Sequence, residues 1–235
     1  MNVLVAIDSW KGCLTSREVN EAVRCALLSV NPDVNVRCIP VSDGGEGFLD
    51  AVEATGNYRR HIVPVHDPLM RLVEAPLLSC GDHFVAELSS ASGLSLLQPE
   101  ERNPLVATSY GTGELIAHAI RLGARSLTLG LGGSAVSDCG QGMLKVLEEE
   151  SKGGILKSFS PQVLQSLDFT LATDVTNPLL GPDGAVYTFA RQKAAPSLSP
   201  KALSAMLAEL EFRASAFAVE SARLLGHDFS TSPGA

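Results

Sequence analysis

The strongest constraint on the fold is a polar, glycine-rich segment that recurs directly after short apolar runs. DSWKG follows residues 3–7, SDGGEG follows residues 34–41, GGSAVSDCG follows residues 126–131, and TDVTNP follows residues 169–172. Apolar runs of this length, bounded by turn residues, are typical of buried parallel strands. In open α/β sheets, loops at the carboxyl ends of strands converge, and helix N-termini there offer free amide donors. The pattern predicts an α/β protein with a ligand site at that edge.

The first 57 residues follow a strand–helix–strand order. A strand is expected over residues 3–7, then a helix capped by Ser16 and stopped by Asn31-Pro32, then a strand over residues 34–41. A short helix over residues 48–54 follows. This βαβ order indicates a doubly wound sheet, so residues 1–57 are predicted to form the N-terminal part of a first domain.

From about residue 58 the pattern changes to alternation, as in RRHIVPV and LVEAPLL with Asp67-Pro68 between them. Alternation around a turn predicts antiparallel strands, so residues 58–225 are predicted to form a second α/β domain with a mixed sheet. Within it we expect strands at 84–88, 126–131 and 169–172, helices at 112–122, from near Gly140 and at 200–225, and a loop at EEESKGG.

Charge and cysteine content exclude several classes of protein. The net charge is −8, and no basic run is longer than Arg59-Arg60, which argues against a nucleic-acid partner. Five cysteines without a CxxC pair indicate reduced thiols. The first apolar run meets Asp8 too early for a signal peptide or a membrane span. We therefore expect a cytoplasmic protein that binds neither membrane nor nucleic acid.

Two glycine-bearing segments are candidates for binding phosphate, although neither matches the GxxxxGK[ST] or GxGxxG pattern. In GGSAVSDCG, glycine lets backbone N–H groups approach a phosphate, which points to Gly132, Gly133 and Ser134. A plain tight turn between strand and helix is the alternative. Gly111 and Thr112 are weaker candidates, since an ordinary turn with a threonine cap explains them equally well.

Charged side chains in these loops are candidates for chemistry. Lys11 is either a solvated surface charge or a cation for a substrate carboxylate or a transferring phosphoryl group. Asp8, Asp43 and Glu46 could coordinate a metal or bind hydroxyls, with turn and capping roles as the alternative. Asp174 ends an apolar strand and could accept a hydroxyl proton or position a metal, or open an Asx-turn. The five histidines show no metal-ligand spacing.

Five blocks together resemble the signatures of the type I glycerate kinase family, in the same order from residue 8 to 193. They are DSWKGCLTSREV, VSDGGEG, TSYGTGELI, LGLGGSAVSDCGQGML and ATDVTNPLLGPDGAVYTFARQK. The resemblance implies two α/β domains, one with flavodoxin-like parallel topology and one with a mixed sheet. It also implies transfer of the ATP γ-phosphoryl group to D-glycerate, giving 2-phosphoglycerate, with ATP and Mg²⁺ as cofactors.

The resemblance also gives candidate site positions, and the role of each is assigned from its chemistry. We expect Asp174 and Lys11 to be catalytic, and Ser134 to take part in phosphate binding. The other matched positions comprise the substrate-binding residues Arg71, Asp8, Asn177 and Glu87, and the metal ligands Asp43, Glu46 and Asp138.

The chain departs from the family pattern in two places. The stretch between GMLKVL and LDFTLATDV is short, and the chain stops at STSPGA where the family continues. The resemblance implies that residues 226–235 begin a return to the first domain, whose two expected strands fall short of the usual sheet of about four to six. Two alternatives stay open: a non-catalytic fragment that binds a ligand or partner, and a kinase for a related small hydroxy acid.

Overall fold

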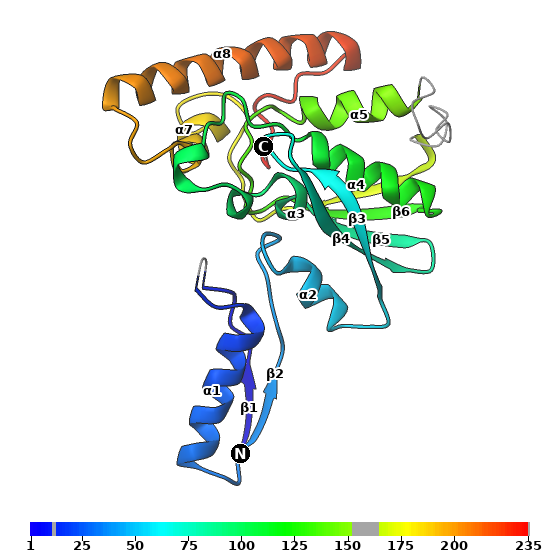
Figure 1. The fold of residues 1–235 in the computed structure, drawn as a ribbon, viewed down its shortest axis with the longest axis vertical. Coiled ribbons are helices and arrows are strands. Elements are labelled where there is room, and N and C mark those ends of the chain that lie inside the picture. Colours follow the sequence, from blue (N-terminus) through cyan, green and yellow to red (C-terminus); the bar gives the residue numbers. More distant parts are fainter. Residues whose placement is uncertain (11–12, 152–164, 235) are drawn as a thin grey trace.

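The chain forms two separate sheets. The computed structural model describes residues 1–10, 13–151 and 165–234. One sheet has two parallel strands, β1 (Asn2–Val5) and β2 (Asn35–Cys38), and the other has five strands in the order β3-β4-β5-β6-β7. Together with the helices, this confirms the predicted α/β class with an incomplete parallel sheet and a mixed sheet (Figure 1).

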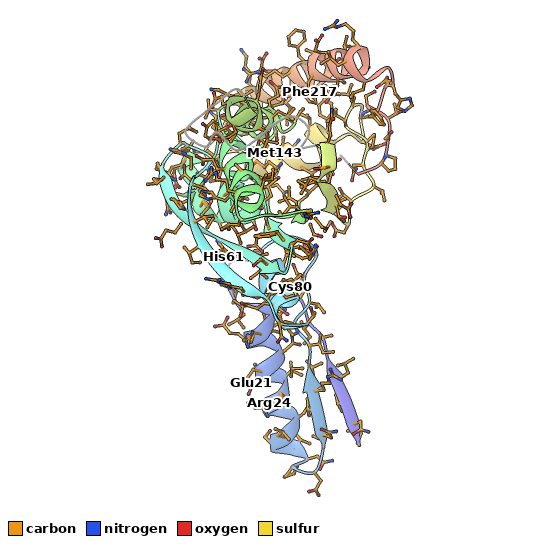
Figure 2. The ribbon with its side chains drawn as sticks, turned by 90° about the vertical axis from the view of Figure 1, so that its right-hand side faces the viewer. Glu21, Arg24, His61, Cys80, Met143 and Phe217 are labelled. Atoms are coloured by element: carbon orange, nitrogen blue, oxygen red, sulfur yellow. The ribbon has the colours of Figure 1, made fainter. Side chains whose placement is uncertain are left out.

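The N-terminal unit consists of β1, α1 (Ser16–Val30) and β2, and it projects away from the rest of the molecule (Figures 1 and 2). The helix begins one residue earlier than expected, because its N-cap is Thr15, which forms a capping box with Glu18. The hydroxyl of Ser16 instead donates to the carbonyl of Ile7 and accepts from the N–H of Val41. These bonds join the helix to the ends of both strands.

The five-stranded sheet is antiparallel on one side and parallel on the other. Its strands are β3 (Arg59–His66), β4 (Leu72–Cys80), β5 (His83–Glu87), β6 (Ser126–Gly130) and β7 (Asp168–Ala172). The β3–β4 and β4–β5 pairs are antiparallel, which confirms the expected alternation, and β5, β6 and β7 are parallel. β3 therefore runs in the same direction as β5, β6 and β7, and all four strands end at one edge of the sheet.

Helices cover both faces of this sheet. On one face, α4 (Tyr110–Arg121) and α5 (Gln141–Ser151) bury a cluster that includes Leu115, Leu127 and Leu129. On the other face, α2 (Phe48–Glu53) packs its Leu49 against Leu78 and Val85. The remaining elements are α3 (Ser89–Ser92), η1 (Leu94–Leu96), η2 (Pro99–Glu101), α7 (Ala185–Phe189), η3 (Ala190–Lys193) and α8 (Pro200–Leu225).

One expectation for a segment is wrong in its first part, and its second part lies outside the described residues. The segment EEESKGG was expected to be a loop, but α5 continues through its first part to Ser151, and the rest lies outside the described residues. Glutamate favours helix, and Glu149 also accepts a hydrogen bond from the Tyr110 hydroxyl and pairs with Lys145 one turn earlier.

The last described residues lie against the segment that follows β7. The N–H groups of Leu179 and Leu180 donate to the carbonyl of Ser230, and the N–H of Gly234 donates to the carbonyl of Asn177. The division into domains at residues 57, 58 and 226 stays a prediction. Within the described parts of the chain, no helix has the length and apolar character needed to span a membrane.

Candidate functional site

Three chain segments meet at the carboxyl edge of the five-stranded sheet. The N–H of Gly132, after β6, donates to the carbonyl of Gly44 in the SDGGEG loop at 3.1 Å, and the N–H of Leu131 donates to Ala172 at the end of β7. A Cβ on Gly132 would lie 2.6 Å from the Cα of Gly45, so only glycine permits this approach. Backbone-to-backbone contact thus brings together three of the four signatures recognised in the sequence.

The turn after β6 presents free backbone donors. Gly133 is exposed and has φ +72, a left-handed conformation suited to glycine. Its carbonyl accepts from Leu94, and the N–H of Ala135 donates to Ser92. Among the described residues, the N–H groups of Gly133 and Ser134 have no acceptor. Two adjacent free amides are the donors that an anion such as phosphate needs.

Asp174 and Glu46 are exposed carboxylates in the two chain segments that contact this turn. Asp174 is two residues past the end of β7, and Glu46 follows the two glycines that contact the turn. Asp43 lies in the same SDGGEG loop and accepts the N–H of Gly45 at 2.9 Å. Asp8 is half-buried and accepts the N–H of Ser9. Lys11, predicted to be catalytic, lies outside the described residues.

Asp138 is a capping residue in this fold. Its Oδ2 accepts from the N–H and hydroxyl of Ser109, both at 2.8 Å, and from the N–H of Gly142, while Oδ1 accepts the N–H of Gly140. These bonds fix the start of α5 and the loop before α4. Both oxygens are thus engaged with protein donors, and the role of Asp138 as a metal ligand stays a prediction. No group of three or more His, Cys, Asp or Glu side chains with a metal-binding arrangement occurs in the described residues.

Gly111 and Thr112 were predicted to bind phosphate, but they are buried beneath the surface. A Cβ on Gly111 would lie 1.8 Å from the carbonyl oxygen of His66, so this glycine allows α4 to pack against the end of β3. The hydroxyl of Thr112 pairs with that of Ser92 at 2.7 Å. Both residues are buried in close packing, and the phosphate-binding role expected for them stays a prediction.

Glu87 ends β5 and joins the sheet to α2. Its Oε2 accepts the N–H of Leu49 at 3.2 Å, and Oε1 accepts the hydroxyl of Ser90 at 3.0 Å. Burial raises the pKa of this carboxyl group, and the Leu49 N–H opposes that rise. Only 8% of Glu87 is exposed, as suits a buried junction between helix and sheet, and its contact with substrate stays a prediction.

Arg71 and Asn177 are both held by the protein's own groups. The Arg71 guanidinium bonds to Asp67 at 2.6 Å, Glu101 at 2.8 Å and the carbonyl of Leu96, and the two carboxylates raise its pKa. These bonds brace the β3–β4 turn. The Asn177 side chain closes its own loop by donating to the carbonyl of Asp183 and the hydroxyl of Thr188. These bonds use three of the five N–H donors of Arg71, and its contact with substrate, like that of Asn177, stays a prediction.

Lys193 is the residue at this edge that the sequence analysis missed. It ends η3, is 8% exposed, and donates from Nζ to the Ser134 hydroxyl at 2.8 Å and to the Val136 carbonyl at 2.6 Å. Burial lowers its pKa to about 8, and the charge of Asp138 opposes the shift. The only signal in the sequence was its place at the end of FARQK, and a single lysine in a pattern is usually a surface residue.

Comparison with known proteins agrees with this geometry. The Escherichia coli (strain K12) glycerate 2-kinase is 37% identical over 255 residues, which cover 100% of this chain and 65% of that protein. The Bacillus subtilis (strain 168) glycerate kinase is 36% identical, again over 100% of this chain and 65% of the relative. A crystal structure of a glycerate kinase 2 candidate from Salmonella typhimurium LT2 matches with a TM-score of 0.75 and 32% identity, covering 100% of this chain and 66% of that one.

This chain therefore spans about 65% of the length of the first two relatives. The sequence profile of the glycerate kinase family matches residues 3–235. With the sheet order and the glycine contacts described above, this match shows that the chain belongs to the glycerate kinase family.

Proposed function

We propose that this chain forms part of a kinase that transfers the γ-phosphoryl group of ATP to D-glycerate, giving 2-phosphoglycerate. The observation that carries the proposal is the turn after β6, where the free N–H groups of Gly133 and Ser134 meet the SDGGEG loop at the sheet edge. Relatives named glycerate kinase and glycerate 2-kinase give the substrate class. Because the chain spans only part of these relatives, its activity belongs to the proposal.

The chemistry requires the acceptor hydroxyl and the phosphoryl group to be held in line. In the proposal, the amides of Gly133 and Ser134 bind phosphate oxygens. Asp174, exposed past the end of β7, orients the hydroxyl of glycerate and accepts its proton. Lys11 neutralises the glycerate carboxylate or the phosphoryl group.

The carboxylates of the SDGGEG loop fit a magnesium ion bound to nucleotide. In kinases Mg²⁺ is held by one or two carboxylates together with phosphate oxygens and water, so a cluster of three side chains is not required. Glu46 is exposed, and Asp43 lies in the same loop beside Gly132 and Gly133. We propose these two as ligands. When bound, Mg²⁺ would neutralise charge on the phosphate oxygens.

An assay of ADP release with a panel of acceptors tests the proposal. We expect D-glycerate to react far faster than glycerol, because glycerol lacks the carboxylate that a cation would bind. Equal rates with glycerol would refute the assignment of the acceptor. Nucleotide binding without release of ADP for any hydroxy acid would favour a non-catalytic fragment instead. The proposal extends to a cytoplasmic location, with small molecules as the only substrates.

A further inference from the structure

Lys193 places a buried positive charge directly behind the turn after β6. The residue ends η3, which packs with α7 and α8 in a small apolar cluster that contains Ala190 and Leu210. From there its side chain reaches Ser134 and Val136, on either side of the buried Ala135. The ammonium group thus lies on the inner side of the same turn that presents the free amides of Gly133 and Ser134.

The partners of Lys193 leave its charge without a direct counter-charge. A buried ammonium is expensive unless it is paired with an acid, yet both of its hydrogen-bond partners are neutral oxygens. Among the described residues, Lys193 forms no ion pair, and the acid whose charge influences its pKa is Asp138, whose own oxygens are engaged elsewhere. A negative charge supplied by a ligand would compensate this site.

The bond to Lys193 also determines how the Ser134 hydroxyl can be used. An ammonium group can only donate, so in the 2.8 Å contact the Ser134 oxygen must accept. The hydroxyl proton of Ser134 is then available for a different partner. Ser134 is half-buried and its own N–H has no acceptor in the described structure, so both its donors can serve a ligand at the turn.

We propose that Lys193 is a positioning residue for phosphate binding, which orients the Ser134 hydroxyl as a donor and supplies the positive charge behind the turn. The ligand is a phosphate group of the nucleotide. The inference rests on the proposed function only in its choice of ligand, since it requires phosphate binding and not transfer to glycerate.

Binding of ADP and of adenosine to the full chain, measured by calorimetry, tests the proposal. Lys193→Met keeps the length of the side chain but removes the charge and the donors, and Ser134→Ala removes the hydroxyl. We expect each variant to bind ADP at least about tenfold more weakly, because a charge-assisted hydrogen bond contributes on the order of 1.5–3 kcal/mol. Adenosine, which has no phosphate, should bind all variants equally. Lys201→Met, at an exposed position on α8, is the matched control and should leave both affinities unchanged.

The double variant, Lys193→Met with Ser134→Ala, tests whether Lys193 acts through Ser134 or contacts the phosphate independently. If Lys193 acts through Ser134, the combined change should weaken ADP binding by clearly less than the product of the two single effects. Lys193→Gln, which keeps a donor but no charge, provides a second variant if Lys193→Met does not fold. Multiplicative effects, equal losses for ADP and adenosine, or a wild-type chain that binds no ADP would each overturn the inference. Coupled loss of ADP binding in a chain that fails to phosphorylate glycerate would support it while refuting the proposed function.

Discussion

The N-terminal unit and the five-stranded sheet are built from the same strand–helix pattern but differ in how far their strands are covered. In the N-terminal unit, α1 covers one face of β1 and β2, and Leu4 remains 62% exposed. In the larger sheet, α4 and α5 cover one face and α2 packs on the other, and Leu127 on β6 is fully buried. Parallel strands are stable mainly when both faces are covered. The larger sheet should therefore be the rigid platform, and the N-terminal unit the less stable region.

The glycine contacts show how the N-terminal unit is connected to the candidate site. The SDGGEG loop comes from the end of β2, yet it rests on the turn after β6 through Gly44 and Gly132. The loop that follows the N-terminal unit thus carries Asp43 and Glu46 to an edge that the larger sheet holds in place. The predictions below test this division, beginning with the residue proposed to be the general base.

Asp174→Asn should lower kcat for glycerate phosphorylation by on the order of 10²–10⁴-fold, the range for loss of a general base. The substitution keeps size and hydrogen-bonding shape but removes charge and basicity. Asp183→Asn is the control, because Asp183 contacts its neighbours through its backbone carbonyl, which accepts from the Asn177 side chain and the Thr188 hydroxyl. Steady-state kinetics of the two variants, with thermal melting to confirm folding, provide the comparison. Near-normal turnover of Asp174→Asn would show that the larger sheet does not supply the base.

Leu127→Ala should lower the free energy of unfolding by about 2–5 kcal/mol, because it creates a cavity in the core of the larger sheet. Leu4→Ala, on β1 of the N-terminal unit, makes the same chemical change on a strand where the side chain is 62% exposed, and it should change stability by less than about 1 kcal/mol. Urea titrations of both variants measure the difference. A large loss for Leu4→Ala would mean that its exposed face is covered in solution.

The regular elements could be predicted from the sequence because their signals are local. The helix expected over residues 200–225 has those bounds in the structure, and the antiparallel pair β3–β4 follows from alternation around Asp67-Pro68. The meeting of glycine-rich loops was also predictable, since parallel strands end at one edge. What the pattern could not distinguish is whether a glycine contacts a ligand or another chain segment, and Gly111 proved to contact the backbone of His66.

The sequence could not show which partners the side chains at the candidate site would have in the folded chain. Asp138 and Glu87 were selected as acids at positions matched to the family, and tertiary contacts engage them with backbone donors from Gly142 and Leu49. Lys193 was overlooked for the converse reason. Its burial depends on η3, α7 and α8 packing together, and no residue near it in the sequence indicates that a charge is enclosed.

Lys193 should also make the free energy of unfolding of the chain depend on pH. Burial lowers its pKa to about 8 in the folded chain, whereas an exposed lysine has a pKa of about 10.4. Between these values the unfolded chain binds more protons, so stability rises with pH. Relative to Lys193→Met, the wild-type free energy of unfolding should gain on the order of 1–2 kcal/mol between about pH 7 and about pH 9.5. Denaturant titrations at both pH values measure this gain. If the free energy of unfolding changed with pH equally in the wild type and in Lys193→Met, the prediction that Lys193 is buried as a charged group would be wrong.

The smallest expected effect tests whether the two regions unfold separately. Thr15→Ala removes the capping box of α1, and loss of such a cap lowers helix stability by about 0.5–2 kcal/mol. Ser199→Ala is the matched change on α8, whose first turn donates the Ala202 N–H to the Ser199 hydroxyl. Amide hydrogen exchange followed by mass spectrometry should show faster exchange in α1 and β2 for the first variant, with the five-stranded sheet unchanged. The second variant should affect α8 and its partner α7 instead. If Thr15→Ala accelerated exchange equally in β5 and β6, the N-terminal unit would unfold together with the larger sheet, and their different burial would not translate into different stability.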